Sequence, residues 1–260
     1  MNLGDAVAIV TGSATGVGAA CARGLAAKGA RVVINYTRSR EQALETQRAC
    51  ETFGVETLLC EADIADDSDC RRMADAALTK WGRIDALVNN AATTVPSDPF
   101  DLDTLSAADF QHVFGVNVVG TYQMVRAVLP AMKQAGSAAI VNISSNVSVT
   151  GGGSSIAYTA SKGAVDAMGR VLARTLGPTI RVNTVCPGVI DTRWMRNALG
   201  VGGYDALERR FSDTAPLRRV ATAADVAEVA IWLIEGADFV TGETIFVDGG
   251  IRLAGGSRKT

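Results

Sequence analysis

Histidine is almost absent from this chain, since His112 is the only one among 260 residues. A single histidine argues against a metal centre built on histidine ligands. It also leaves a serine nucleophile without a base, because His112 falls five residues before Asn117 within one expected helix. We therefore expect neither a metal enzyme nor a serine–histidine hydrolase.

Paired-cysteine motifs and long apolar runs are missing as well. The five cysteines are odd in number and show no CxxC spacing. With no signal peptide at the start of the chain, this usage predicts reduced thiols in a cytoplasmic protein. No run reaches the roughly 18 to 20 apolar residues that a membrane-spanning helix needs, so no membrane association is expected.

Neither sign of charge is in excess. The 25 basic and 27 acidic residues leave a net charge of −2 at pH 7. This near-balance argues against a nucleic acid or a membrane surface as the partner. Hydrophobic residues make up 48% of the chain, which is typical of a globular protein with a substantial core.

What the chain does contain is a strict alternation of β-rich runs and helix-like segments. The expected strands cover 6–11, 31–36, 56–61, 86–89, 138–144, 181–186 and 244–248. The expected helices cover 17–28, 40–53, 67–80, 107–135, 155–176 and 223–235. This pattern predicts one α/β domain over residues 1–254, with a doubly wound parallel sheet of seven strands and helices on both faces. Residues 255–260 are predicted to be a flexible tail.

One long segment breaks the alternation. Residues 191–220 are polar and contain glycines, together with the bulky side chains of Trp194, Met195, Tyr204 and Phe211. An insertion of that length is usually a lid or a binding loop. A surface helical hairpin that only packs is the alternative interpretation.

A glycine-rich stretch, "TGSATGVG" (11–18), follows the first expected strand directly. Gly12, Gly16 and Gly18 supply a tight turn, a close backbone approach and a helix–strand contact. The N-terminus of the next helix adds oriented N–H groups and a partial positive charge. The stretch predicts a pyrophosphate site; the alternative is a plain connector, and no Gly-Lys-Ser/Thr follows to make it a P-loop.

Tyr158 and Lys162 stand four residues apart in "SSIAYTASKGAV" (154–165). At positions i and i+4 of a helix their side chains share one face. A neighbouring ammonium stabilises the phenolate, so we expect Lys162 to lower the tyrosine pKa from its ordinary value of about 10. The pair predicts a tyrosine that transfers protons at neutral pH.

Four motifs in this order, "TGSATGVG", "NNAA" (89–92), "YTASK" (158–162) and "PGVIDT" (187–192), resemble the short-chain dehydrogenase/reductase family. The resemblance covers residues 5–250 and includes members such as 3-oxoacyl-[acyl-carrier-protein] reductases and glucose dehydrogenases. It implies a Rossmann-type fold and an NAD(P)-dependent enzyme that interconverts a ketone and a secondary alcohol. A catalytically silent dinucleotide-binding sensor or scaffold is the alternative function. In the family's usual "NNAG", Ala92 would be a glycine.

The resemblance also implies roles for single residues. Ser145 would stabilise the oxyanion that develops on the substrate, with Ser144 as the competing candidate. Asn117 would hold a water that links the lysine to solvent, unless it is an ordinary packed asparagine. The implied catalytic residues are Asn117, Ser145, Tyr158 and Lys162. The implied cofactor contacts are Gly12, Ser13, Thr15, Gly16, Val17, Gly18, Tyr36, Thr37, Arg38, Ser39, Asp63, Ile64, Asn90, Ala91, Tyr158, Lys162, Pro187, Gly188, Ile190 and Thr192.

The end of the second expected strand, "INYTRSR", bears on the choice of cofactor. Asn35 stands where NAD-binding proteins carry a carboxylate for the ribose hydroxyls. Arg38 and Arg40 offer cations to a ribose 2′-phosphate, so the sequence predicts NADP(H) in preference to NAD(H). The alternative is that both arginines are solvated surface charges. Asp63 is either an adenine contact, by resemblance, or the cap of the third helix.

Two further expectations concern the substrate and the assembly. The substrate is expected to be a small carbonyl or alcohol compound, in a fairly apolar pocket formed by 93–100, 147–153 and 191–215. Arg193 or Arg196 would meet an anionic substrate tail, unless it is a salt-bridged surface residue. The resemblance implies a homotetramer that meets along helices 107–135 and 155–176 and along the last strand.

Overall fold

The computed structural model describes residues 1–254, except for the side chains of residues 193, 194 and 197–201. The predicted tail, residues 255–260, therefore lies outside the described residues. At the centre is a parallel sheet with the strand order β3-β2-β1-β4-β5-β6-β9. The strands are β1 Val7–Val10, β2 Arg31–Tyr36, β3 Thr57–Glu61, β4 Ala86–Asn89, β5 Ala138–Ile143, β6 Ile180–Pro187 and β9 Thr244–Val247. The predicted doubly wound sheet of seven strands is confirmed.

The strands are mostly apolar because both faces of the sheet are covered. In β1, Val7 and Ile9 face one hydrophobic core, whereas Ala8 and Val10 face another. Successive side chains of a strand point to opposite faces, so a run that is buried on both faces has few polar positions.

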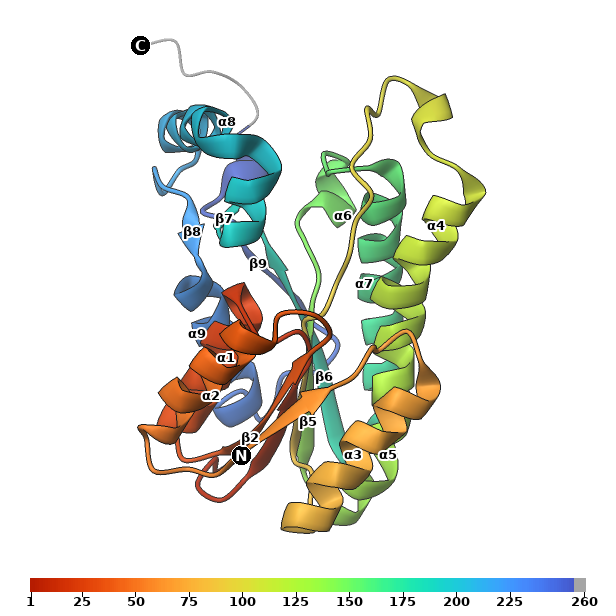
Figure 1. Ribbon diagram of the computed structural model, residues 1–260, viewed down its shortest axis with the longest axis vertical. Coiled ribbons are helices and arrows are strands. Elements are labelled where there is room, and N and C mark those ends of the chain that lie inside the picture. The colour runs from red at the N-terminus through yellow and green to blue at the C-terminus, as the bar shows by residue number, and fades with distance from the viewer. Residues whose placement is uncertain (255–260) are drawn as a thin grey trace.

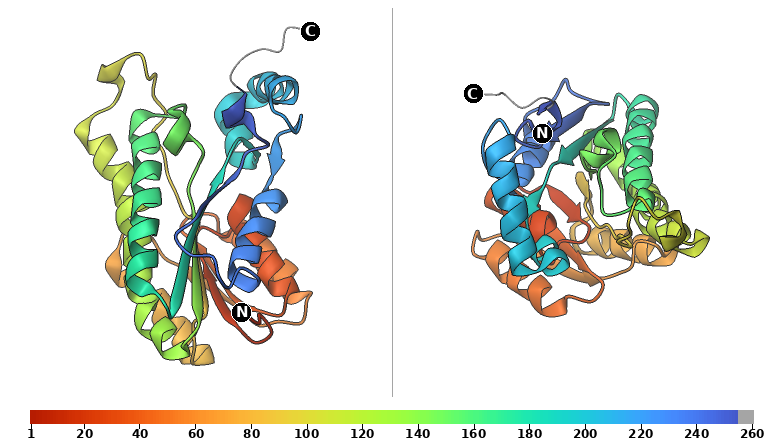
Figure 2. Two further views of the ribbon diagram at one scale, coloured as in Figure 1. Left: turned by 180° about the vertical axis from the view of Figure 1, so that it is seen from behind. Right: turned by 90° about the horizontal axis from the view of Figure 1, so that it is seen from above.

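Helices lie on both faces of the sheet (Figures 1 and 2). One face packs against α1 Gly16–Ala27, α2 Arg40–Glu51 and α9 Ala223–Glu235. The other packs against α3 Asp67–Trp81, α5 Thr121–Ala135 and α7 Ile156–Leu176. Among the described residues, no helix is both long enough and apolar enough to cross a membrane.

The predicted helix over 107–135 is helical throughout, but its middle is a π-helical turn. The segment forms α4 Ala107–Phe114, a π-helical turn η2 Gly115–Gly120, and then α5. Asn117 lies in η2, and the hydroxyl of Thr121 donates to its carbonyl at 2.8 Å. A Cβ on Gly120 would come within 2.9 Å of the carbonyl oxygen of Ile64. The wider turn thus sits where the helix runs closest to the loop after β3, and π turns occur mostly at functional sites.

The inserted segment 191–220 folds mainly as one helix, α8 Arg193–Thr214, between the short paired strands β7 Ile190–Asp191 and β8 Ala221–Thr222. In Figure 1, α8 stands above the upper end of the sheet, on the opposite side from α4. The remaining short elements are η1 Leu102–Thr104, α6 Val147–Thr150 and η3 Ile251–Leu253.

The carboxyl ends of all seven strands meet at this upper edge. From β1 the chain passes to β2 on one side, while β4 pairs with β1 on the other side. The strand order therefore reverses between β1 and β4, and ligands of open α/β sheets bind at such a switch point. The loops that follow these two strands begin at Thr11 and Asn90.

Candidate active site

The glycine loop between β1 and α1 has the conformation that its sequence predicts. Gly12 and Gly16 have φ of 61° and 59°, in the left-handed region that favours glycine. A Cβ on Gly12 would lie 2.9 Å from the Cα of Ala91, and one on Gly18 would lie 2.5 Å from Nδ2 of Asn90. Side chains at these two positions would push the glycine loop away from the β4 loop.

The side chain of Asn90 fastens the glycine loop to the end of β4. Its Nδ2 donates to the carbonyls of Thr11 and Gly12 at 2.9 and 3.0 Å. In return, the hydroxyl of Thr11 accepts from the backbone N–H groups of Asn90 and Ala91. The two loops at the switch point therefore form one hydrogen-bonded unit. Ala92, which replaces the usual glycine, is exposed beyond this unit.

Asn35 does not lie at the rim of the site, which corrects the role inferred from the sequence. Strand β2 continues to Tyr36, and the side chain of Asn35 is buried. Its Oδ1 accepts from the N–H of Gly12 at 2.9 Å, and its Nδ2 donates to the carbonyl of Ala62 at 2.9 Å. Asn35 thus ties the glycine loop to the end of β3.

The start of α1 fits the pyrophosphate of a dinucleotide. Thr15, at the N-cap, makes no side-chain capping bond, and the first turn holds no acidic residue. A Cβ on Gly16 would meet only the methyl of Thr192, at 3.7 Å. The free N–H groups and the positive end of the helix suit an anion.

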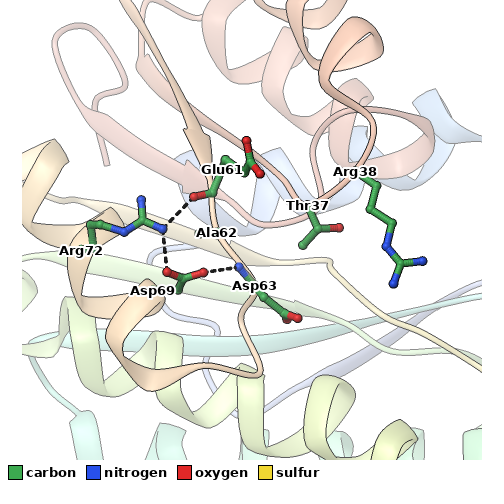
Figure 3. A pocket seen from close by; sticks show the side chains of 7 residues that line it. All are labelled: Thr37, Arg38, Glu61, Ala62, Asp63, Asp69 and Arg72. Atoms are coloured by element: carbon green, nitrogen blue, oxygen red, sulfur yellow. Dashed lines mark hydrogen bonds and ion pairs between the residues drawn. The ribbon is translucent and has the colours of Figure 1, made fainter.

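A cavity of about 530 Å³ lies at the carboxyl ends of β2 and β3 (Figure 3). In it, Arg72 pairs with Asp69 at 2.6 Å and donates to the carbonyl of Glu61 at 2.8 Å. Arg38 forms no ion pair with any of the described residues, and its guanidinium extends along the opposite side of the cavity. The lining residues are Thr37, Arg38, Glu61, Ala62, Asp63, Asp69 and Arg72.

The two predicted adenine contacts after β3 differ in accessibility. The Oδ1 of Asp63 accepts from the N–H of Ala65 at 2.9 Å. The cap of α3 is Asp66, which accepts from the N–H of Ser68, so the alternative role of Asp63 as that cap is wrong. Ile64 is buried, and its carbonyl accepts from Nε2 of Gln123.

Tyr158 and Lys162 lie on one face of α7, as predicted. Helix α7 begins with Ser155 as its cap, which places Tyr158 in the first turn. The amine of Lys162 is 5.5 Å from the centre of the Tyr158 ring. It is buried and donates to the carbonyl of Ile143, the last residue of β5, at 2.9 Å.

Burial shifts the pKa values of both groups toward their neutral forms. It raises the pKa of Tyr158 to about 12, while a hydrogen bond with Ser145 acts in the opposite direction. It lowers the pKa of Lys162 to about 8, against the opposing effects of Cys186 and Asp166. The predicted lowering of the tyrosine pKa by Lys162 is therefore wrong for the chain alone, because desolvation of the phenolate outweighs the neighbouring amine.

The geometry separates the two serines that follow β5. Ser144 is buried, and its hydroxyl donates to the backbone carbonyl of Lys162 at 3.1 Å. Ser145 is half-buried, and its side chain acts to lower the pKa of Tyr158. Ser145 therefore has the position to contact a substrate beside Tyr158, whereas Ser144 holds α7 against the sheet.

Asn117 joins the loop after β4 to α7. Its Oδ1 accepts from the N–H of Thr93 at 2.8 Å, and its Nδ2 donates to the carbonyl of the same residue at 3.0 Å. The same Nδ2 donates to the hydroxyl of Ser161 at 2.9 Å. No hydrogen bond to Lys162 is described, so the catalytic role of Asn117 stays a prediction, but its side chain does more than pack.

The segment after β6 closes the other side of the site. A Cβ on Gly188 would lie 2.9 Å from the Cβ of Asp248, which shows how closely residues 187 and 188 approach the end of β9. Ile190 begins β7 and is partly buried in the core. Thr192 caps α8 by accepting from the N–H of Met195 at 3.3 Å.

One expected pocket wall, 93–100, contacts the residue that directly follows another, 147–153. Thr94 and Ser154 share a hydrogen bond between their hydroxyls at 2.7 Å, and the N–H of Ser97 donates to the carbonyl of Ser154. Tyr204, in contrast, is buried rather than lining an open pocket.

Arg196 stacks on the ring of Tyr204 at 4.0 Å and binds Asp191 through two hydrogen bonds of 2.7 and 2.8 Å. It is therefore the salt-bridged residue of the alternative interpretation. The side chains of Arg193 and Trp194 lie outside the described residues.

The sequence reasoning missed two polar side chains behind the site, Ser161 and Asp166. Both lie on the buried face of α7. Asp166 follows Lys162 by one helical turn, a spacing that would have pointed to it.

A dinucleotide cradle beside a tyrosine, a lysine and a serine defines a nucleotide-dependent oxidoreductase. Residues 12–252 match the family model described as enoyl-(acyl carrier protein) reductase. The chain belongs to the short-chain dehydrogenase/reductase family, as its motifs predicted.

Relatives of known name span nearly the whole chain. A ketoacyl reductase associated by name with the granaticin polyketide synthase of Streptomyces violaceoruber is 39% identical, over 95% of this chain and 96% of that one. The 2-(R)-hydroxypropyl-CoM dehydrogenase of Xanthobacter autotrophicus is 38% identical, over 94% and 97% of the two chains. The solved structure of levodione reductase superposes with a TM-score of 0.89 at 30% identity, over 97% of this chain and 99% of that one. This protein is accordingly an oxidoreductase that acts on CH–OH groups with an NAD(P) cofactor.

The buried amine of Lys162 should make stability depend on pH. Its pKa is lowered in the folded state, so between about pH 8 and the ordinary lysine value the unfolded chain binds one more proton. The free energy of unfolding should then rise with pH over this window, by up to about 1.4 kcal/mol per pH unit. In Lys162→Met this rise should be missing.

Urea unfolding of both proteins at several pH values between 7 and 10.5 measures this difference. Equal pH dependence of the parent and the variant would contradict the burial of a titrating amine.

Proposed function

We propose that this protein is an NADP(H)-dependent oxidoreductase that interconverts a ketone and a secondary alcohol, with Tyr158 as the proton donor or acceptor. The observation that carries the proposal is the grouping of Tyr158, Lys162 and Ser145 beside the glycine-loop cradle. When bound, the nicotinamide supplies or accepts the hydride at the carbonyl carbon.

In the direction of reduction, Ser145 and Tyr158 both address the carbonyl oxygen. The hydroxyl of Ser145 donates a hydrogen bond to the oxygen as negative charge develops on it. The hydroxyl of Tyr158, which is protonated at neutral pH because its pKa is about 12, donates its proton to the same oxygen. The ammonium of Lys162 then stabilises the phenolate that remains.

A silent dinucleotide-binding sensor or scaffold is the second candidate. It needs the cradle but has no use for a buried tyrosine and amine, whose burial opposes the charged form of each. Retention of both groups therefore supports the enzyme.

The substrate we propose is a 3-oxoacyl compound or another small ketone. The names of a ketoacyl reductase and of levodione reductase among the relatives support this class. We propose that residues 93–100 and 147–153 form one wall of the substrate site, and that the segment 191–220 acts as its lid within one domain of residues 1–254.

Replacing Tyr158 tests the proton transfer. Tyr158→Phe should lower kcat with NADPH across a panel of ketones by about 10²- to 10⁴-fold, the range for loss of a general acid. NADPH affinity should persist, because the cradle is untouched. Tyr122→Phe, on the exposed side of α5, serves as the matched control and should keep the parental kcat. A Tyr158→Phe variant with the parental kcat would refute the mechanism.

The preference for NADP(H) rests on Arg38. It faces the cavity beside Thr37 and has no carboxylate partner among the described residues, whereas the charge of Arg72 is already paired with Asp69. Glu61 and Asp63 share the cavity, and the hydroxyl of Tyr36 binds Glu61 at 3.1 Å. Arg38 is thus the cation available to a 2′-phosphate.

Affinity for the two cofactors tests this assignment. The parent should bind NADPH about tenfold or more tightly than NADH, in line with one charge-assisted hydrogen bond. Arg38→Ala should abolish most of that difference by weakening NADPH binding alone. The control is Arg48→Ala, which replaces an exposed arginine in the last turn of α2. Fluorescence titration measures both ligands, and equal affinities in the parent would contradict the phosphate pocket.

We further propose a homotetramer in the cytoplasm. Apolar side chains are exposed on the outer faces of η2, α5 and α7, namely Val119, Tyr122, Ile156 and Val171. All five cysteines are free, which suits a reducing compartment. Light scattering should give the mass of four chains, and Val171→Asp should reduce it, since a buried unpaired charge opposes association. A monomeric parent would contradict the tetramer, and recovery in a membrane or secreted fraction would contradict the location.

A further inference from the structure

A buried carboxylate that the mechanism does not use lies behind the catalytic lysine. Asp166 follows Lys162 by one turn of α7, and only 5% of its surface is exposed. Its two oxygens lie 3.7 and 3.9 Å from the sulfur of Cys186 on β6. Asp166 takes part in no ion pair that the structure describes. A buried carboxylate without a cationic partner is costly.

The thiol of Cys186 connects this carboxylate to the serine loop. Burial raises its pKa to about 12, so the thiol is neutral at working pH and donates its S–H to Asp166. The side chains of Ser144 and Ser148 and the backbone of Ser145 act in the opposite direction on this pKa. The negative charge of Asp166 is thus held in place but not neutralised.

The groups that face Lys162 can be named element by element. On α7 they are Tyr158 and Asp166, and on β6 the neutral thiol of Cys186. The end of β5 offers the carbonyl of Ile143. From η2, the amide of Asn117, which is uncharged, binds Thr93 and the hydroxyl of Ser161. Among the described residues, Asp166 is therefore the source of negative charge behind the amine.

We propose that Asp166 is a positioning residue that keeps Lys162 protonated in the working enzyme. The inference rests on the proposed function, in which the ammonium stabilises the phenolate of Tyr158. Asp166 acts through the low-dielectric interior rather than by contact, since the amine donates to Ile143 and no ion pair joins the two. Burial alone favours the free amine, and Cys186 and Asp166 oppose it. Of these two only Asp166 carries a charge at working pH, since burial keeps the thiol neutral.

The direct test is the pH profile of Asp166→Asn, which removes the charge and keeps the shape. Without the carboxylate, Lys162 loses its proton at lower pH. The alkaline limb of kcat for ketone reduction should therefore move down by about one pH unit, the effect of losing a nearby opposite charge. Asp75→Asn, an exposed aspartate of α3, is the matched control and should leave the limb in place.

A second readout does not depend on turnover. Lys162 is expected to bond the nicotinamide ribose, so the pH at which NADPH affinity weakens should move in the same direction in Asp166→Asn. Cys186→Ser, which keeps a donor to the carboxylate, should leave both profiles where they are. If Asp166→Asn does not fold, Asp166→Ser removes the same charge with a smaller side chain and replaces it.

The outcomes separate the inference from the proposed function. The inference is supported if the pH profiles of kcat and of NADPH affinity shift in Asp166→Asn but not in the control variants. A folded neutral variant with unmoved profiles, a uniform loss of kcat at every pH, or an equal shift in Cys186→Ser overturns it. A parent that reduces no ketone refutes the proposed function, and the pH dependence of NADPH binding then still decides the role of Asp166.

Discussion

The constraint on which this site depends is the burial of an amine at the carboxyl end of β5. Lys162 reaches the carbonyl of Ile143 from the second turn of α7, and that contact fixes how the helix sits on the sheet. Ser144, which follows β5, also holds α7 against the sheet, because its hydroxyl donates to the backbone carbonyl of Lys162. With α7 held in this way, Tyr158 in the preceding turn meets Ser145 at the open edge of the sheet. The burial that positions Tyr158 and Lys162 thus also destabilises the protonated form of Lys162.

Three asparagines hold the loops that surround the contact between α7 and the end of β5. Asn35 and Asn90 each bind the backbone of the glycine loop, one from the end of β2 and one from the end of β4. Asn117 binds the backbone of Thr93 and the hydroxyl of Ser161. An amide side chain can donate and accept at once, so each one satisfies backbone groups that lie beyond the ends of strands. The cradle and the reacting residues are in this way parts of one hydrogen-bonded framework.

The sequence predicted the sheet because buried parallel strands and amphipathic helices leave strong periodic patterns. It predicted the pairing of Tyr158 with Lys162 because helical spacing is fixed. It did not predict the π turn at Asn117, the inward direction of Asn35 or the burial of Tyr204, since each depends on contacts between segments distant in the chain. The pKa of Tyr158 was predicted in the wrong direction for the same reason: the desolvation that dominates it comes from the assembled fold and not from its neighbours in sequence.

The pKa values of Tyr158 and Lys162 indicate which charged forms the protein itself does not stabilise. Burial drives Tyr158 toward the phenol and Lys162 toward the free amine, so neither charged form is favoured by the protein's own groups, apart from the field of Asp166 and the bond from Ser145. Oxidation of an alcohol needs a phenolate, and an oxidised nicotinamide carries the positive charge that would stabilise one. Reduction needs the phenol, which is already the stable form. In the proposed mechanism, the same buried pair would therefore serve both directions.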